Sequence, residues 1–240
     1  MMKLFATAIL LLAAASIQAQ TAAQPTPSGI PSGVPVKPGT KPAAVAVKTE
    51  VDPGYLTEKT YTNRGLGFEI AFPSSWVIPG IDSEKYWQEK GYELRPKINR
   101  NDPQQAANIR RYEKQVTLLL TAYRSAIGTP GNAILLISVE DLSTNPSVRD
   151  AVDYFDLMRA QIGTMKLPPG YEYSVTQAEK LGAQQFAFLD ISTGKEKKRL
   201  YATVRDGYAI ILAFTYHSGE DLTVFRRILE EADFSLKSAK

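Results

Sequence analysis

Two adjacent serines after a proline are the first residues that could do chemistry. Ser74 and Ser75 follow Pro73, and His217 is the one histidine of the 240-residue chain. A nucleophilic serine needs a general base, so a hydrolase would have to pair Ser74 or Ser75 with His217. The G-x-S-x-G motif of the nucleophile turn is absent. The favoured interpretation is that the serines turn the chain and let Trp76 pack back onto a sheet.

The residue types give little support to metal or cofactor chemistry. The chain has no cysteine and a single histidine, which argues against a zinc site. No acidic spacing matches an EF-hand loop, and no glycine pattern matches a phosphate-binding loop. The neighbouring acids Glu140–Asp141 and Glu220–Asp221 diverge in a helix or a strand, so they fit a strand end and a helix start better than acid–base pairs. We therefore expect no catalytic residue, no metal and no cofactor.

A segment at about residues 80–114 combines aromatic and cationic side chains. Such mixtures are enriched in recognition surfaces. The alternative is that the aromatic rings cover a sheet while the charged groups stay in solvent. Capping residues predict that two short helices begin here, at Asp82 and at Asp102. The candidate binding residues of this insert are Tyr86, Trp87, Tyr92, Arg95, Arg110 and Arg111.

The first 54 residues differ in composition from the rest. Residues 1–19 combine Lys3, an apolar stretch and a small residue at the end, which is the pattern of a cleaved signal peptide. An uncleaved anchor is the alternative, although the apolar run is short for a membrane span. Residues 20–54 are rich in proline and small residues, which predicts a disordered tether. We expect an exported, periplasmic or extracellular protein with no membrane span after cleavage.

Residues 55–240 are expected to form a single domain with little net charge. Four of the 28 basic residues and two of the 25 acidic residues precede it, which leaves a net charge of +1. A nucleic-acid-binding protein needs a concentrated basic face, so we do not expect this class. The dense basic run Lys195–Arg199 lies where a turn meets a strand. We expect it to be a solvated hairpin end.

Hydrophobic periodicity predicts the elements that would position these residues. Leu66–Phe72 alternates as a half-buried strand does, and Pro73 ends it. Asp206–Gly207 between two apolar runs predicts a hairpin. The strand Tyr208–Tyr216 is apolar on both faces, so it should be central, with something packed closely over its alanines. The other predicted strands are 116–123, 133–140, 171–176, 184–192 and 200–205.

Two long helices complete the pattern. One is predicted from Asn145, with a buried stripe of Val148, Val152, Phe155, Met158 and Ile162. The other is predicted from Ser218, which can form a capping box with Asp221. The helices are segregated and do not alternate with every strand. This order indicates an α+β fold with a central, mainly antiparallel sheet.

The first strand and the last helix resemble those of a known family. Gly67–Trp76, with the sequence GFEIAFPSSW, is similar to the "GF…YP..W" opening of the PsbP-like superfamily, and Leu222–Leu236 is similar to its closing helix and short strand. This superfamily includes the extrinsic PsbP subunits of photosystem II, the Ran-binding Mog proteins and bacterial envelope proteins related to DcrB. The resemblance covers roughly residues 60–237. It implies an α/β/α sandwich around an antiparallel sheet, no shared catalytic residues, and partners in larger assemblies.

Two features depart from this family pattern. The insert at about 80–114 is longer than the compact form of the family, and the tether lacks the cysteine that a lipid anchor needs. The expected function is an exported, non-catalytic binding module of the cell envelope that acts on a protein or envelope partner. A secreted serine hydrolase using Ser74 or Ser75 with His217 is the first alternative. A carrier of a small apolar ligand, held between the sheet and a helix, is the second.

Overall fold

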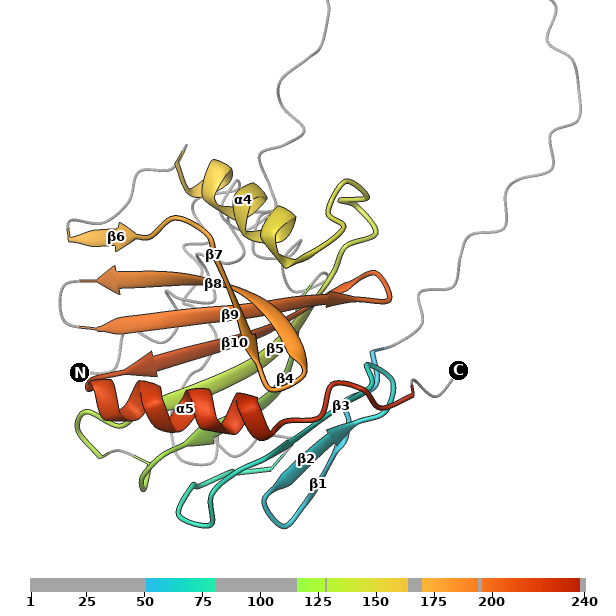
Figure 1. Ribbon diagram of the computed structural model, residues 1–240. Coiled ribbons are helices and arrows are strands. Elements are labelled where there is room, and N and C mark those ends of the chain that lie inside the picture. Colours follow the sequence, from blue (N-terminus) through green and yellow to red (C-terminus); the bar gives the residue numbers. More distant parts are fainter. Residues whose placement is uncertain (1–50, 81–115, 128, 164–169, 194–195, 238–240) are drawn as a thin grey trace, which may run out of the picture.

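The computed structural model describes residues 51–80, 116–127, 129–163, 170–193 and 196–237 (Figure 1). The expected signal peptide at 1–19 and the tether up to residue 50 lie outside the described residues. So do the helices expected from Asp82 and Asp102 and all the candidate binding residues of the insert. The described residues form an α+β fold with antiparallel sheets, as the sequence predicts.

A seven-stranded sheet carries most of the core, and all its strand pairs are antiparallel. Its order is β4-β5-β10-β9-β8-β6, and β7 pairs with β8 beside β6. The strands are β4 (Val116–Tyr123), β5 (Ile134–Asp141), β6 (Tyr171–Tyr173), β7 (Gln177–Leu181), β8 (Gln184–Thr193), β9 (Lys197–Arg205) and β10 (Tyr208–Tyr216). The sequence predicts all of these except β7, whose residues are mostly polar and exposed.

The hairpin between β9 and β10 turns as predicted. Asp206 has φ 50° and Gly207 has φ 79°, the left-handed pair that a two-residue hairpin turn requires. β10 lies between β5 and β9 and is therefore central. Its small residues Ala209 and Ala213 belong to the buried cluster on the α4 side of the sheet. Both alanines are buried, so the prediction that this strand is central and covered on both faces is confirmed.

α4 (Ala151–Ile162) begins later than the sequence predicts. Asn145 forms a turn instead, because Asp150 is the better cap: its carboxylate accepts two NH groups of the first helical turn, each at 2.9 Å. The predicted start at Asn145 is therefore wrong. So is the predicted burial of Val152, which is 40% exposed. The buried face of the helix consists of Ala151, Tyr154, Phe155, Met158 and Ile162.

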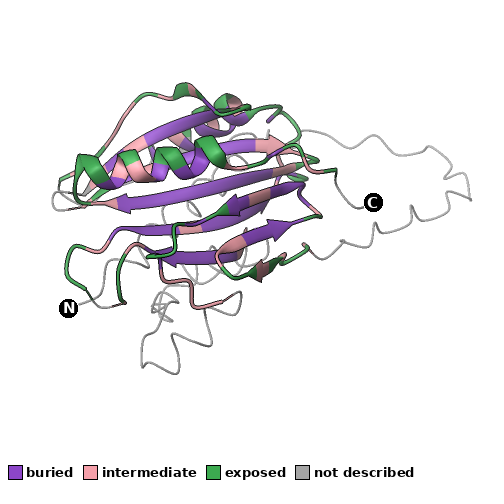
Figure 2. Cartoon of the chain, turned by 60° about the horizontal axis from the view of Figure 1, so that its bottom comes forward, coloured by how far each residue is buried: buried purple, intermediate pink, exposed green. Residues whose placement is uncertain are grey.

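α5 (Gly219–Glu231) begins with the predicted capping box. The Ser218 hydroxyl accepts the NH of Asp221 at 3.1 Å, and the Asp221 carboxylate accepts the NH of Ser218 at 2.9 Å. The helix packs on the face of the main sheet opposite α4, where the Phe225 ring stacks on Phe214 with 4.2 Å between centroids. Figure 2 shows the buried strands and the exposed outer sides of the helices. Neither α4 nor α5 is long and apolar enough to span a lipid bilayer.

A second, antiparallel sheet precedes the main one in the chain. It consists of β1 (Tyr55–Thr57), β2 (Thr60–Asn63) and β3 (Phe68–Ala71). The sequence misses β1 and β2. It predicts β3 within Leu66–Phe72, and the alternating apolar residues of that segment are at most 5% exposed: Leu66, Phe68, Ile70 and Phe72.

The turn after β3 has the predicted form. The backbone NH of Trp76 donates to the carbonyl of Pro73 at 3.0 Å, and Ser74 and Ser75 are exposed. Trp76 itself is 1% exposed, and its ring centroid lies 5.7 Å from that of Phe72. The tryptophan therefore returns to the core while the serines face solvent.

Two short backbone pairings join the small sheet to the rest. Glu69 of β3 exchanges hydrogen bonds of 2.7 and 3.0 Å with Asp233, just beyond α5. Val77 exchanges bonds of 2.8 and 2.9 Å with Tyr123, the last residue of β4. The small sheet and α5 together therefore cover one face of the main sheet, and α4 covers the other.

Candidate functional site

The residues of the hydrolase hypothesis occupy separate parts of the structure. Ser74 and Ser75 lie in the turn after β3, and His217 lies between β10 and α5. Within the described ranges, no hydrogen bond joins either serine to His217. The His217 ring lies beside Gly131, with 4.0 Å between the ring and the place where a glycine Cβ would be. Asp221 accepts the backbone NH of His217 at 3.1 Å, and no other acid of the described segments bonds to this histidine.

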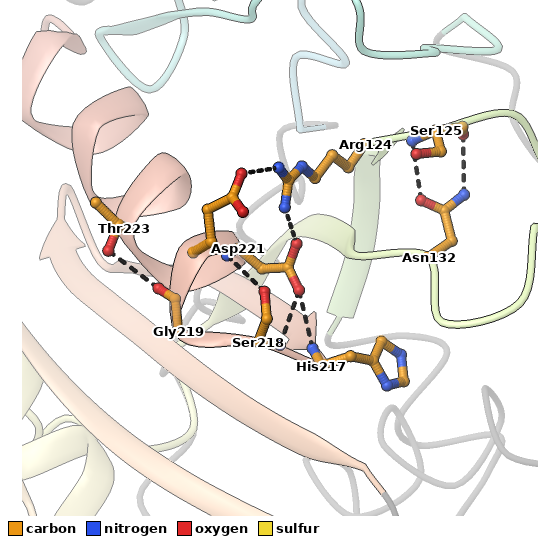
Figure 3. A network of polar contacts seen from close by, with 9 residues as sticks. Arg124, Ser125, Asn132, His217, Ser218, Gly219, Asp221 and Thr223 are labelled. Carbon is orange, nitrogen blue, oxygen red and sulfur yellow. Dashed lines mark hydrogen bonds and ion pairs between the residues drawn. The ribbon is translucent and has the colours of Figure 1, made fainter.

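Asp221 is the centre of a polar network at the start of α5 (Figure 3). One carboxylate oxygen accepts the backbone NH groups of His217 and Ser218. The other binds the guanidinium of Arg124, which directly follows β4 and also donates to Glu220 at 2.6 Å. Burial raises the pKa of Asp221, but the hydrogen bonds from Arg124, Ser218 and His217 outweigh burial and hold the pKa below its usual value. The network therefore fastens the end of β4 to the start of α5.

The loop next to this network is also built by hydrogen bonds. The Asn132 side chain accepts the NH of Ser125 at 2.9 Å and donates to the carbonyls of Ser125 and Ala126 at 2.9 and 3.1 Å (Figure 3). A single amide thus closes the connection between β4 and β5. The predicted loop at 125–132 is confirmed.

The described residues of the basic run, 196–199, lie at a hairpin end as we expected, but they are not all solvated. Lys197 is exposed, but Lys198 is only 5% exposed and the Arg199 side chain only 14% exposed. The cause is strand alternation, because successive residues of β9 point to opposite faces of the sheet. Lys198 enters the α4 face and Arg199 enters the α5 face.

Arg199 lies flat against the aromatic core. Its guanidinium carbon is 4.3 Å from the centre of the Phe188 ring, and it donates to both oxygens of Asp190 at 2.7 and 2.8 Å. This is the paired geometry that arginine forms with a carboxylate. Burial by itself would lower the pKa of Arg199, but the bonds to Asp190 and Tyr201 raise it overall. The guanidinium is therefore a permanent, preorganised cation.

The network around Arg199 continues to α5. The Tyr201 hydroxyl donates to Glu179 of β7 at 3.0 Å, and Glu179 also pairs with Arg226 of α5. Burial raises the pKa of Tyr201 to about 12, so it stays a donor at physiological pH. This series of contacts contains two arginines and two carboxylates, so its formal charge is zero.

The adjacent acids Glu140 and Asp141 each accept a hydrogen bond that stabilises the fold. Glu140 lies at the end of β5, as predicted, where it is 2% exposed and accepts the Tyr154 hydroxyl at 2.7 Å. Asp141 accepts the NH of Ser143 at 2.9 Å. Among the described residues, no three acidic or histidine side chains gather closely enough to hold a metal ion. The sequence gives no signal for the Arg199 network, because its members come from β7, β8, β9 and α5.

Comparison with known proteins concerns the fold. The sequence matches no protein family model and no curated protein. It is similar to a crystal structure from Bacteroides thetaiotaomicron VPI-5482, with 12% identity and a TM-score of 0.39 over 77% of this chain. That match covers 51% of the other chain, so this chain spans about half its length.

Two further similar structures have descriptive names. One is cyanobacterial PsbP (CyanoP) from Synechocystis sp. PCC 6803, with 13% identity and a TM-score of 0.39 over 82% of this chain and 98% of that chain. The other is LpqN, involved in cell envelope biogenesis of Mycobacterium tuberculosis, with 12% identity and a TM-score of 0.36 over 70% and 83%. PsbP belongs to the superfamily that the sequence resembles. No statement about activity follows from likenesses of this size.

Proposed function

We propose that the protein is an exported, non-catalytic binding module of the cell envelope that acts on a protein or envelope partner. The observation that carries this proposal is the engagement of Asp221 with Arg124, Ser218 and the backbone of His217. In a Ser-His-Asp triad the acid orients the imidazole of the histidine. Asp221 instead bonds to the backbone of His217 and caps the start of α5.

The insert at about 80–114 is the proposed recognition surface. Its composition supports this role, because aromatic side chains and arginine are enriched where proteins bind one another. The proposed contact residues are Tyr86, Trp87, Tyr92, Arg95, Arg110 and Arg111. The tether at 20–54 would give such a surface reach from its point of attachment.

Capture from the native envelope tests this function. Trp87→Ala and Arg95→Ala should each weaken capture of the partner at least about tenfold, because buried tryptophan and arginine anchors dominate binding energy. Their melting temperatures should match that of the unmodified protein. Lys197→Ala, at an exposed position, is the matched control and should capture normally. If the variants lose stability along with capture, the insert residues stabilise the fold and do not contact the partner.

Active-site labelling tests the non-catalytic part of the proposal. A fluorophosphonate probe should not label the purified protein, since no hydrogen bond activates Ser74 or Ser75 within the described ranges. Labelling that disappears in Ser75→Ala and in His217→Ala would instead establish a hydrolase.

Processing tests the proposed export. If residues 1–19 are a cleaved signal peptide, the protein purified from its own host should begin at Gln20. An intact Met1 on the mature protein would point to a retained anchor or to no export.

A further inference from the structure

Two buried hydrogen-bond donors lack an acceptor near the C-terminal end of α4, and a buried lysine beside them has only one long ion pair. The Tyr171 hydroxyl and the Arg159 Nε are buried and have no hydrogen-bond partner within the described part of the chain. The Lys198 side chain is 7% exposed, and its ammonium forms a long ion pair with Glu196 at 3.6 Å. Buried polar groups are nearly always bonded, so the Tyr171 hydroxyl and the Arg159 Nε call for an explanation.

Strand register places the Lys198 and tyrosine side chains on one face of the sheet. Tyr173 pairs with Ile191, and Ile191 pairs with Lys198. Directly paired residues in antiparallel strands point to the same side. Tyr171 lies two residues before Tyr173, so it shares that side, and the two rings have centroids 6.4 Å apart. All of them face α4.

The last turn of α4 brings the arginine to the same place. A Cβ on Gly163, directly after α4, would lie 3.7 Å from the Tyr173 hydroxyl. Gly163 donates its NH to the carbonyl of Arg159 at 2.9 Å, so Arg159 is one helical turn away. The helix end, β6 and the start of β9 therefore meet here, on the α4 side of the sheet (Figure 1).

The nearby carboxylates Asp156 and Glu196 satisfy these cations only in part, through ion pairs of 3.6 Å each. Asp156 lies 3.6 Å from Arg159 Nη1, and the same Asp156 oxygen already accepts the Thr176 hydroxyl at 2.6 Å. Burial lowers the pKa of Lys198, and the proximity of Glu196 offsets this effect only in part. Both cations thus have room for a further acceptor.

We propose that Lys198, Tyr171 and Arg159 form a binding site for a small carboxylate carried on an apolar chain. A carboxylate has two oxygens and can accept hydrogen bonds from all three donors. Charge-assisted bonds of this kind are the strong ones, and they would satisfy a lysine that is otherwise costly to bury.

The surroundings of the donors favour an apolar stem on this ligand. The buried residues of this part of the α4 side are hydrophobic: Met158, Ile162, Leu189, Ile191 and Leu200. Apolar walls around a few convergent polar groups are typical of small-molecule sites. The site is distinct from the insert and goes beyond the proposed recognition function.

Isothermal titration calorimetry on the full chain tests the site with sodium octanoate as the probe. Octanoate should bind, and acetate should bind at least about tenfold more weakly because it lacks the stem. Lys198→Met should reduce octanoate affinity at least about tenfold, and Tyr171→Phe should reduce it severalfold. Lys197→Met, on the exposed neighbour, is the matched control and should leave the affinity unchanged.

Folding and binding can be separated in these variants. Lys198→Met removes a charge that is costly to bury, and the Glu196 carboxylate that it leaves is partly exposed to solvent, so the melting temperature should change little. No octanoate binding up to about 5 mM, or equal binding by Lys198→Met, would overturn the site. Inorganic phosphate is the second probe. Phosphate that binds as tightly as octanoate and depends on Lys198 would overturn the assignment to a carboxylate on an apolar chain.

Discussion

Arg199 shows how one side chain can cover an aromatic core and anchor a charge network. Its guanidinium covers the Phe188 ring, which is 7% exposed. The same group holds both oxygens of Asp190. Lysine could keep the charge but could not form the flat, two-bonded contact.

We therefore predict that Arg199→Lys lowers the free energy of unfolding by about 1 kcal/mol, because it loses the paired bond to Asp190 and the contact with the Phe188 ring. Urea denaturation measures this change. Lys197→Ala, one residue away and exposed, should change it by less than about 0.5 kcal/mol. An Arg199→Lys protein as stable as the unmodified one would mean that the network contributes nothing to stability.

The Asp221 network predicts a pH dependence. The pKa of Asp221 is lower in the folded protein than in the unfolded chain, so its stabilisation is present above the unfolded pKa and is lost as pH falls below about 4. The stability difference between the unmodified protein and Asp221→Asn should thus be largest near neutral pH and shrink toward about pH 3. Urea midpoints at several pH values measure it. A difference that is constant with pH would contradict the ionised network.

At this scale, the sequence predicts residues that act locally. It predicts the Ser218 cap and the exposed turn at Ser74 and Ser75, because each depends on neighbours within a few positions. It cannot predict the partners of Lys198 or Arg199. Those partners come from other strands and from the helices, and only the register of the sheet brings them together.

At the scale of elements, the β7–β8 turn rests directly on α5. Gly182 has φ +56°, and a Cβ there would overlap the carbonyl of Glu230. Gly207, in the β9–β10 turn, has φ +79° but open space around it. A side chain at Gly207 would therefore meet backbone strain alone, whereas a side chain at Gly182 would meet both backbone strain and a steric clash.

We predict that Gly182→Ala destabilises the protein more than Gly207→Ala does. Gly207→Ala should cost about 1 kcal/mol from its left-handed conformation alone. Gly182→Ala adds a clash with backbone and should cost about 1–3 kcal/mol more. Thermal unfolding of the two variants measures the difference. Equal effects would show that α5 can shift away from the turn without cost.

Element boundaries show where sequence patterns are weakest. The β9–β10 hairpin is predicted correctly because Asp206–Gly207 fixes its turn locally. The start of α4 is predicted wrongly because Asn145 and Asp150 are both acceptable caps, and the structure uses Asp150. β7 has no hydrophobic alternation of its own and forms as the partner of β8.

At the scale of the whole molecule, a segment after α5 joins the two sheets. The Phe234 ring stacks on Phe68 of β3 at 5.5 Å and meets Phe186 of β8 edge-on at 5.2 Å. Asp233 next to it pairs with β3 through backbone hydrogen bonds. The small sheet thus depends on residues from the far end of the chain.

Phe234→Ala should lower the free energy of unfolding by about 3 kcal/mol, because it leaves a cavity between the sheets. Hydrogen exchange should accelerate more in β2 and β3 than in β9 and β10, since the small sheet loses the stacking of Phe234 on Phe68. Lys237→Ala, exposed and close in sequence, should change neither quantity. Uniform acceleration in both sheets would mean that they unfold as one unit.

The pairing of Val77 with Tyr123 has a consequence for how this protein could diversify. It fixes the chain three residues before Gly80 against the last residue of β4, the strand that begins at Val116. Closing a longer loop between fixed ends costs only about 0.6 kcal/mol for each doubling of its length. The segment between Gly80 and Val116 could therefore be replaced by segments of other length and composition at little cost in stability. Such replacements could change what the protein binds while both sheets stay the same.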